Sequence, residues 1–471
     1  MTNKTNKKTS LIDEQGRVLK KNTVLIAVAN LGSKLVNFIL APLYARYLSP
    51  VDYGTTDLIM TTLSLLLPFV CLNIYEATFR FGSNDKKRNQ VNLSTSIILC
   101  IVPTLLIGSI AVISSISKRH TDIMFPLICL GLVFSMYSTV LSYYMRGIGK
   151  IAPYAFNGLF NAIVNLIVSI VFIVRLHMGL VGWVWALVIS NFASVVVLAL
   201  YADARHTFNI NSFDFSHLKK CLKYCIPLMP GAILWWVMNA SDRYIIALFI
   251  SSSANGIYAI SNKFPGLFST IESIFYQAWT SSAVALEKLD DKNRFYSDIL
   301  EKYVIIIFVT ICGLLFVTQP ANCILFGKKY ESAWMYSFPL IFAVAVHALN
   351  SFLGSFYIVE KKTKGAFYST LIGALINTSL NFIFIPKFGI MAAAFTTLIG
   401  YVCTLVYRIF DTRKLGYKMN ISIKLTNIAF VCISGCLYYV DAMWSFVIRI
   451  GVLIVIVIFN RELLFSLIKK N

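Results

Sequence analysis

The sequence is poor in charged residues, and this shortage argues against a soluble protein. Only 13% of its 471 residues are charged, whereas an ordinary soluble protein carries about 25%. Hydrophobic residues make up 58% of the chain, and the mean hydropathy is +0.72. A soluble chain of this length needs far more polar surface, so the composition excludes a soluble enzyme.

Acidic residues are scarcer still. The chain has 21 Asp and Glu against 42 Lys and Arg, which gives a net charge of +21. In a soluble protein this imbalance would indicate nucleic-acid binding, but in a membrane protein Lys and Arg collect in the cytoplasmic loops. We therefore expect no nucleic-acid partner, and we attribute the charge to membrane topology and to anionic lipids.

Catalytic and metal-binding motifs are also missing from the sequence. It contains no H-E-x-x-H, no G-x-S-x-G and no phosphate-binding G-x-x-x-x-G-K-[ST]. Most of the ten cysteines lie in apolar runs, where cysteine acts as a small hydrophobic residue. Cys221 and Cys225 have no second ligand pair at zinc spacing. We therefore predict no enzyme activity, no metal and no cofactor.

The chain does contain repeated apolar runs of about 20 residues, the length that crosses about 30 Å of hydrocarbon as a helix. These runs predict an all-α, polytopic membrane protein with about fourteen spans, or twelve to fourteen if the weaker runs are discounted. The eighth run is the weakest because it is polar. The spans are placed at residues 24–44, 58–79, 94–116, 123–144, 153–174, 180–201, 226–250, 256–281, 303–319, 332–358, 365–385, 389–408, 424–440 and 443–460.

The distribution of basic residues sets the orientation of these spans. If both termini are cytoplasmic, the inside segments hold 31 Lys and Arg and the outside loops hold seven. This asymmetry predicts that both termini are cytoplasmic. The first 23 residues are polar and include Asp13 and Glu14, so they lack the pattern of a cleaved signal peptide.

A faint internal repeat indicates how the spans are grouped. An offset of 202 residues superimposes Asn37, Ala45, Ser49 and Gly54 on Asn239, Ala247, Ser251 and Gly256. A repeat of six helices gives two lobes of equal orientation, related by an axis along the membrane normal, with a cavity between them. The predicted domains are a basic tail (1–23), an N-terminal lobe (24–201), an inter-lobe segment (202–225), a C-terminal lobe (226–410) and two additional helices with a cytoplasmic tail (411–471).

Polar and ionisable residues inside the spans are the candidate functional residues, because such residues usually face a cavity or a partner. The ionisable candidates are Lys34, Asp242, Arg243, Lys263, Glu272 and His347. The amide candidates are Asn30, Asn37, Asn161, Asn239 and Asn377.

Each group has a plainer alternative. Asp242 and Arg243 are neighbours and can neutralise each other, and a lone histidine such as His347 is often a packing residue. The asparagine stripes that contain Asn161 and Asn377 can hold helices together by hydrogen bonds instead of contacting a sugar.

Several stretches of the sequence are similar to those of a known family. The stretch Ala41–Gly54 (APLYARYLSPVDYG) resembles the start of bacterial polysaccharide flippases of the multidrug/oligosaccharidyl-lipid/polysaccharide exporter superfamily. Further matching stretches follow in the same order, namely Tyr224–Pro230 (YCIPLMP), Ser241–Tyr244 (SDRY), Asn255–Tyr258 (NGIY), Gln277–Trp279 (QAW) and Ile385–Ile390 (IPKFGI). The resemblance covers residues 20–460.

This resemblance implies fourteen helices, arranged as two six-helix lobes plus two C-terminal helices, around a V-shaped cavity. It implies translocation of an undecaprenyl-pyrophosphate-linked oligosaccharide from the inner to the outer leaflet of the bacterial cytoplasmic membrane, for O-antigen, capsule or exopolysaccharide assembly. The implied partners are this lipid-linked substrate, membrane lipids, a polysaccharide polymerase and glycosyltransferases.

The candidate residues fit this function in three roles. A pyrophosphate needs cations near the midplane, which Lys34, Arg243 and Lys263 would supply. The amides would line the cavity, and Glu272, Asp242 and His347 are candidates for ion coupling. Asp242 and Glu272 also suit a cation-coupled multidrug antiporter of the same superfamily, which is the main alternative. An intramembrane transferase would need clustered acids or histidines that the sequence does not show.

The charge asymmetry gives a direct topological prediction. Reporter fusions after Phe81 and after Ala202 should report the cytoplasm, and fusions near Val51 and near Asn255 should report the outside. Paired reporters, one active on each side of the membrane, measure this. Two or more reversed signals would overturn the orientation.

Overall fold

The computed structural model describes residues 25–26, 28–83, 85–117, 123–285, 292–417, 424–440 and 442–462. Within these ranges every regular element is a helix. The prediction of an all-α, polytopic membrane protein is therefore confirmed. Nine of the described helices are long and apolar enough to cross a membrane, and a tenth crossing is made if one bent helix pair is a single span. The count of fourteen stays a prediction.

The chain divides into two compact units, and the division does not follow the sequence in order. Unit 1 comprises Met1–Leu48 and Ile59–Ile233, and unit 2 comprises Ser49–Leu58 and Leu234–Asn471. One helix, α2 (Pro50–Val70), is shared, because its first nine residues belong to unit 2.

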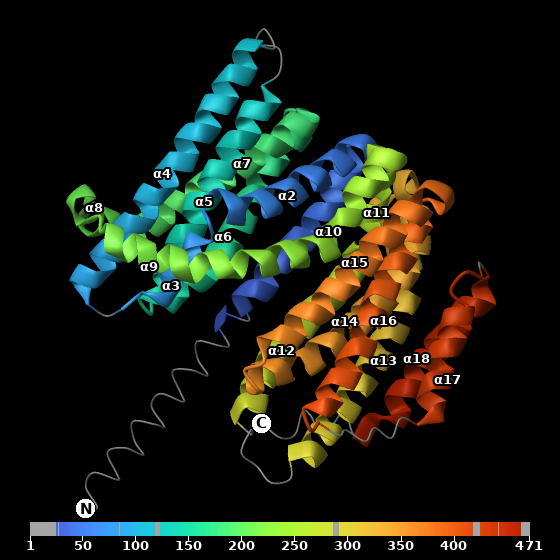
Figure 1. Cartoon of the computed structure of the whole chain (residues 1–471). Coiled ribbons are helices and arrows are strands. Elements are labelled where there is room, and N and C mark those ends of the chain that lie inside the picture. The colour runs from blue at the N-terminus through green and yellow to red at the C-terminus, as the bar shows by residue number, and fades with distance from the viewer. Residues whose placement is uncertain are drawn as a thin grey trace, which may run out of the picture. The chain divides into compact units, whose positions relative to one another are not determined.

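Unit 1 is a bundle of long helices (Figure 1). Residues 28–47 are helical and precede α2. The helices that follow α2 are α3 (Ile74–Arg80), α4 (Lys86–Ser117), α5 (Met124–Gly147), α6 (Ile151–Ser169), α7 (Gly179–Tyr201), α8 (Ala204–Thr207) and α9 (Phe215–Cys225). A π-helical segment, Ile170–Arg175, continues α6. In this bundle α5 lies between α4 and α7 and packs against both.

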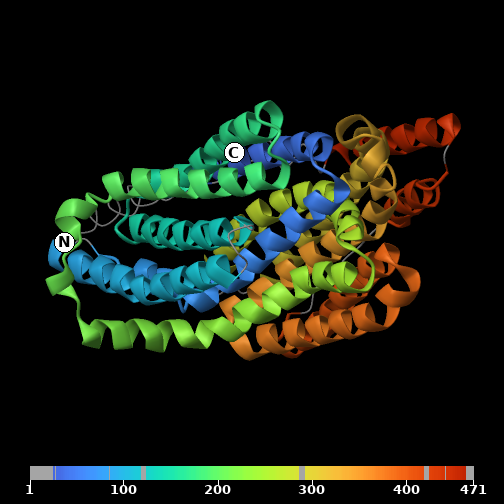
Figure 2. The same cartoon turned by 90° about the horizontal axis from the view of Figure 1, so that it is seen from above.

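Unit 2 contains most of α10 (Met229–Phe249) and all later helices. These are α11 (Ser252–Ser261), α12 (Lys263–Ala285), α13 (Lys292–Phe326), α14 (Ala333–Val359), α15 (Thr363–Phe388), α16 (Ile390–Lys414), α17 (Leu425–Cys436) and α18 (Met443–Phe459). Helix α14 packs against α16, α12 and α13. Helices α17 and α18, red in Figures 1 and 2, lie at one edge of the unit and pack on α13.

The second helix begins eight residues earlier than the predicted span 58–79. Its start is a capping arrangement: the Ser49 hydroxyl accepts a hydrogen bond from the Asp52 N–H at 3.1 Å, and Pro50 occupies the first helical position. The helix ends at Val70, and Leu72 and Asn73 adopt left-handed backbone angles (φ 51° and 56°) before α3. The predicted single span is thus a longer helix followed by a short one.

The predicted eighth span, 256–281, is divided as well. Helix α11 ends at Ser261 and α12 begins at Lys263, with Asn262 between them. The Asn262 amide donates to the Tyr258 carbonyl at 2.8 Å, which ties the end of α11 to the break. In contrast, the predicted span 303–319 is only the middle of α13, which has 35 residues and a length of about 52 Å.

An aromatic cluster forms the core of unit 2. Trp279 stacks on Phe352 with ring centroids 4.3 Å apart, and Phe356 stacks on Tyr417 at 4.2 Å. The Trp279 indole N–H donates to the Ser355 hydroxyl at 2.8 Å. This cluster joins α12 to α14, so it holds the helix that carries Glu272 in place.

A fully buried arginine attaches the last helix to this unit. Arg449 of α18 is 1% exposed. Its guanidinium donates to the Leu315 carbonyl and to the Gln319 side-chain oxygen, both at 3.0 Å and both on α13. These acceptors stabilise a charge that would otherwise be very costly inside a membrane.

The closest helix crossing in unit 2 joins the start of α2 to α11. A Cβ atom at Gly54 would lie 1.8 Å from the Ser252 carbonyl oxygen, and one at Gly256 would lie 2.2 Å from the Pro50 carbonyl oxygen. Only glycine fits at either position, because the clashing atoms belong to the backbone.

Gly256→Ala should therefore destabilise the protein by more than about 2 kcal/mol, through overpacking at this crossing. The measurement is thermal unfolding of the detergent-purified protein, followed by size-exclusion chromatography. Gly266→Ala is the matched control, since a Cβ at this helical position meets no atom within 4 Å. Equal unfolding temperatures for the two variants would contradict the crossing.

Candidate functional site

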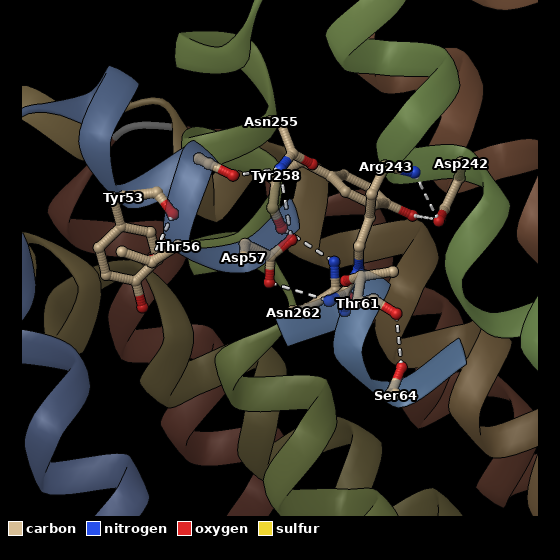
Figure 3. Close-up of polar contacts among 11 residues, drawn as sticks. Tyr53, Thr56, Asp57, Thr61, Ser64, Asp242, Arg243, Asn255, Tyr258 and Asn262 are labelled. Atoms are coloured by element: carbon tan, nitrogen blue, oxygen red, sulfur yellow. Dashed lines mark hydrogen bonds and ion pairs between the residues drawn. The ribbon is translucent and has the colours of Figure 1, made fainter. Parts of the chain in front are cut away.

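The candidate site lies in unit 2, beside the crossing of α2 and α11. The crossing brings Asn255 of α11 next to α2, where its amide donates to the Gly54 carbonyl at 3.0 Å and to the Asp57 carboxylate at 3.3 Å (Figure 3). Asp57 is one turn beyond Gly54 on α2. The close backbone approach therefore places a carboxylate in the interior of the unit.

The partner of this carboxylate is Arg243 of α10. The Arg243 guanidinium donates to Asp57 at 2.8 Å, and the two side chains are 25% and 13% exposed. Figure 3 shows the two groups facing each other across the gap between α2 and α10. A charge-assisted bond of this geometry, in a poorly solvated place, is strong.

Asp242, the sequence neighbour of Arg243, makes different contacts. Its carboxylate accepts a hydrogen bond from the backbone N–H of Arg243 at 2.9 Å and another from the Tyr258 hydroxyl of α11. Asp242 is 5% exposed and Tyr258 is 1% exposed. The structure thus brings together two of the candidates from the sequence, but it assigns the arginine side chain to Asp57.

Lys263 adds a second cation to the same region. Its ammonium lies 5.8 Å from the centre of the Tyr53 ring, and Tyr53 is on α2, one turn before Asp57. A cation over an aromatic face is attracted by the ring quadrupole. With Asp57, Asp242, Arg243 and Lys263, this cluster holds two positive and two negative groups.

A second polar group lies between α12, α14, α16 and α10. Glu272 of α12 is 5% exposed, and its carboxylate is 4.0 Å from Nδ1 of His347 on α14. The His347 ring packs edge-on against Tyr401 at 5.0 Å. The Tyr401 hydroxyl donates to the Asn239 side-chain oxygen at 2.8 Å. Three of the sequence candidates therefore form one chain of contacts across four helices.

Two candidate amides bond to neighbouring helices. Asn161 of α6 donates to Asn191 at 3.2 Å and to Ser194 at 3.0 Å, both on α7. Asn377 of α15 donates to Thr397 of α16 at 3.4 Å and accepts from Asn381 at 3.3 Å. These contacts are of the kind that holds membrane helices together.

The remaining candidates lie on the first helix, in unit 1. Asn30, Lys34 and Asn37 are all exposed along residues 28–47. Their spacing of four and three residues places them on one face, as the sequence pattern predicts.

Among the residues of these networks that sequence reasoning did not select are Asp57, Tyr258 and Tyr401. Asp57 lies just outside the predicted second span, and its partner is 186 residues away, so no local pattern reveals it. Tyr258 and Tyr401 are aromatic residues in apolar runs, and only their contacts show that the hydroxyls are used.

One further cation, Arg408 of α16, was also missed. Its guanidinium donates to the Asn350 carbonyl, to the Ser369 hydroxyl at 3.0 Å and to the Thr370 hydroxyl at 3.3 Å. Among the described residues it forms no ion pair, so all of its partners are neutral.

Metal chemistry finds no support in the part of the chain that the structure describes. No group of three or more His, Cys, Asp or Glu is placed to hold an ion there.

Comparison with known proteins gives a consistent result. A family model described as polysaccharide biosynthesis protein matches residues 43–335. The capsular polysaccharide biosynthesis protein CapF of Staphylococcus aureus is 24% identical over 419 residues, which are 83% of this chain and 99% of that protein. A putative protein of the Lsg locus of Haemophilus influenzae is 25% identical over 282 residues, 57% of this chain and 69% of that protein.

Solved transporters share the fold. A structure of the lipid II flippase MurJ in an inward closed conformation superimposes with a TM-score of 0.70 at 15% identity, covering 94% of this chain and all of that one. A multidrug resistance MATE family transporter in an inward-facing conformation gives 0.67 at 14% identity, covering 83% and 98%. The match to the family model spans more than half of the sequence, and so the chain belongs to the polysaccharide biosynthesis protein family and has the membrane-transporter fold that MurJ and MATE proteins share.

Proposed function

We propose that this protein is a flippase that moves an undecaprenyl-pyrophosphate-linked oligosaccharide from the inner to the outer leaflet of the bacterial cytoplasmic membrane. The observation that carries the proposal is the family match over residues 43–335, which includes the helices that hold Asp57, Asp242, Arg243, Lys263 and Glu272. A lipid-linked sugar needs cations for its pyrophosphate and amides for its hydroxyl groups, and unit 2 offers both in its interior. No catalytic step is part of this proposal.

The same proposal implies an orientation in the membrane and the enzymes that act on each side of it. Both termini face the cytoplasm, where glycosyltransferases build the substrate, and the polymerase that uses the product acts on the other side. O-antigen, capsule and exopolysaccharide assembly are the pathways that need this step.

Lys34, Arg243 and Lys263 are the proposed head-group cations. Arg243 is held by Asp57 at 2.8 Å, so an incoming pyrophosphate has to compete with that carboxylate. The pyrophosphate bridge carries one negative charge on each of its two phosphates, so it offers the guanidinium two charged groups where Asp57 offers one. Release of Asp57 would then accompany binding.

A cation-coupled multidrug antiporter is the second candidate. The favouring observation is the set of buried carboxylates in unit 2, because Asp242 and Glu272 are each 5% exposed and suit a lipophilic cation better than a phosphate. An assay of dye efflux from cells, run beside an assay of polymer export, separates the two functions.

Energy for outward movement can come from the substrate itself. Moving a negative charge outward across a membrane whose inside is negative is favourable by about 2.3 kcal/mol per charge per 100 mV. If a proton or sodium ion also contributes, Glu272 is the proposed coupling group, because His347 is its neighbour at 4.0 Å and can share a proton with it. Asp242, with two hydrogen-bond donors already on its carboxylate, is the weaker candidate.

Lys34→Ala and Arg243→Ala should each lower polymer export to below about a tenth of wild type while protein levels stay near normal, since hydrogen bonds to charged groups contribute about 1.5–3 kcal/mol. Export is measured by surface polymer staining in cells. Lys34→Arg should keep partial function. Normal export by both alanine variants would refute the phosphate role.

A double variant distinguishes substrate binding from simple charge pairing at Arg243. If Arg243 only neutralises Asp57, Asp57→Asn combined with Arg243→Gln removes both charges and should restore export. If Arg243 binds the pyrophosphate, as proposed, the double variant should remain as defective as Arg243→Ala. Restoration of export would remove Arg243 from the head-group site.

Glu272→Gln should make transport insensitive to the ion gradient, so its defect against wild type should be largest under a large gradient, because the glutamine cannot exchange an ion between the two states. The measurement is transport of labelled lipid-linked oligosaccharide into proteoliposomes with an imposed proton or sodium gradient. Asp242→Asn is the matched control, and we expect it to lower stability without changing the gradient dependence. Transport that ignores both gradients in wild type and in Glu272→Gln would exclude coupling and leave a flippase driven by the membrane potential.

A further inference from the structure

A groove with a volume of about 280 Å³ lies between α6 and α7 in unit 1. Its walls come from the first ten residues of α6 and the last five of α7. Most of the lining is apolar and partly exposed. The lining residues are Ala152, Pro153, Phe156, Asn157, Phe160, Val197, Leu198 and Tyr201.

One buried polar atom in this lining lacks a hydrogen-bond partner among the described residues. This atom is the side-chain oxygen of Asn157. The next two asparagines of the same stripe are satisfied, because Asn161 bonds to α7 and Asn165 accepts from the Tyr44 hydroxyl at 2.8 Å. An unpaired buried amide oxygen is costly, and a donor from outside the chain would satisfy it.

A lysine side chain lies at the rim of the same groove. Lys150, just before α6, is exposed, and its ammonium donates to the Tyr201 carbonyl at the end of α7 at 2.9 Å. That contact uses one of the three N–H donors of the ammonium and leaves two for a ligand. The groove therefore combines an apolar wall, a buried acceptor and a positive rim.

We propose that this groove binds the head group of a bilayer phospholipid that carries a hydrogen-bond donor, such as phosphatidylethanolamine. The lipid phosphate binds Lys150, the ethanolamine N–H donates to the Asn157 side-chain oxygen, and the start of the acyl chain lies along Phe156 and Phe160. The interacting groups are complementary. The Lys150 ammonium is positive and the lipid phosphate is negative, and the Asn157 side-chain oxygen accepts a hydrogen bond from the ethanolamine ammonium.

The size of the groove limits the occupant to part of a lipid. Sites for drug-sized molecules have volumes of about 300–1,000 Å³, and this groove lies below that range. It is too small for an oligosaccharide. The proposal is thus independent of the transported substrate and of the residues assigned to it in unit 2.

The test compares two lipids with the same acyl chains, because phosphatidylcholine has the same phosphate but no N–H donor. Unfolding temperatures of the full-length, detergent-purified protein are measured against added lipid, and they yield an apparent affinity for each. We expect phosphatidylethanolamine to bind at least about fivefold more tightly, the factor that one hydrogen bond provides. Equal affinities in the wild type, the result expected if a water fills the groove, would overturn the proposal.

Variants assign the effect to the groove. Asn157→Leu should abolish the preference between the two lipids, and it should raise the unfolding temperature without lipid, because it removes an unsatisfied acceptor. Asn161→Leu, the same change one turn away, should lower stability but keep the preference. Lys150→Ala should weaken both lipids equally, because they share the phosphate. A preference that survives in Asn157→Leu would contradict the assignment.

Discussion

The contact between the backbones of α2 and α11 is the constraint on which the polar interior of unit 2 depends. Because Gly54 and Gly256 have no side chains, Asn255 reaches the carbonyl of Gly54 and Asp57 lies opposite Arg243. The crossing is reciprocal: each glycine approaches the carbonyl four residues before the other glycine. Ser49 and Ser251, also 202 residues apart, cap the two helices with the same side-chain contact at 3.1 Å. Positions that the internal repeat pairs thus perform the same structural task.

Charge balance in this interior explains why cations that look alike in the sequence are not equivalent. Arg243 has a carboxylate partner, whereas the guanidinium of Arg408 is surrounded by a carbonyl and hydroxyl groups. Burying a cation costs less free energy when the cation has a carboxylate partner. Such a cation binds an anionic ligand less readily, because the ligand has to displace that partner. An arginine with neutral partners keeps its full field and attracts an anion without such an exchange. The neighbours of each cation therefore determine how readily it could bind an anion.

The composition and the spacing of residues predict much of this fold. The contacts that they do not predict join residues far apart in the sequence. Apolar runs predict the helices, and Ser49 and Pro50 mark the true start of α2, although hydropathy alone places that start eight residues late. The polarity of residues 256–281 indicates a weak span, but only the structure shows the break at Asn262. Of the site, Asp242, Arg243, Lys263, Glu272 and His347 could be named from the sequence, but Asp57 could not. Their pairing could not, since Asp57 and Arg243 meet across 186 residues and Tyr401 and Asn239 across 162.

The buried Arg449 has a consequence for the order in which the chain is assembled. An arginine at the centre of a helix costs about 2.5–3.5 kcal/mol to insert into a bilayer, and α18 has only 17 residues to offset it. Its acceptors lie on α13, made some 134 residues earlier in the chain. Insertion of α18 into a bilayer would therefore depend on contacts with α13, a helix that has already emerged from the ribosome. Its insertion would be coupled to tertiary packing.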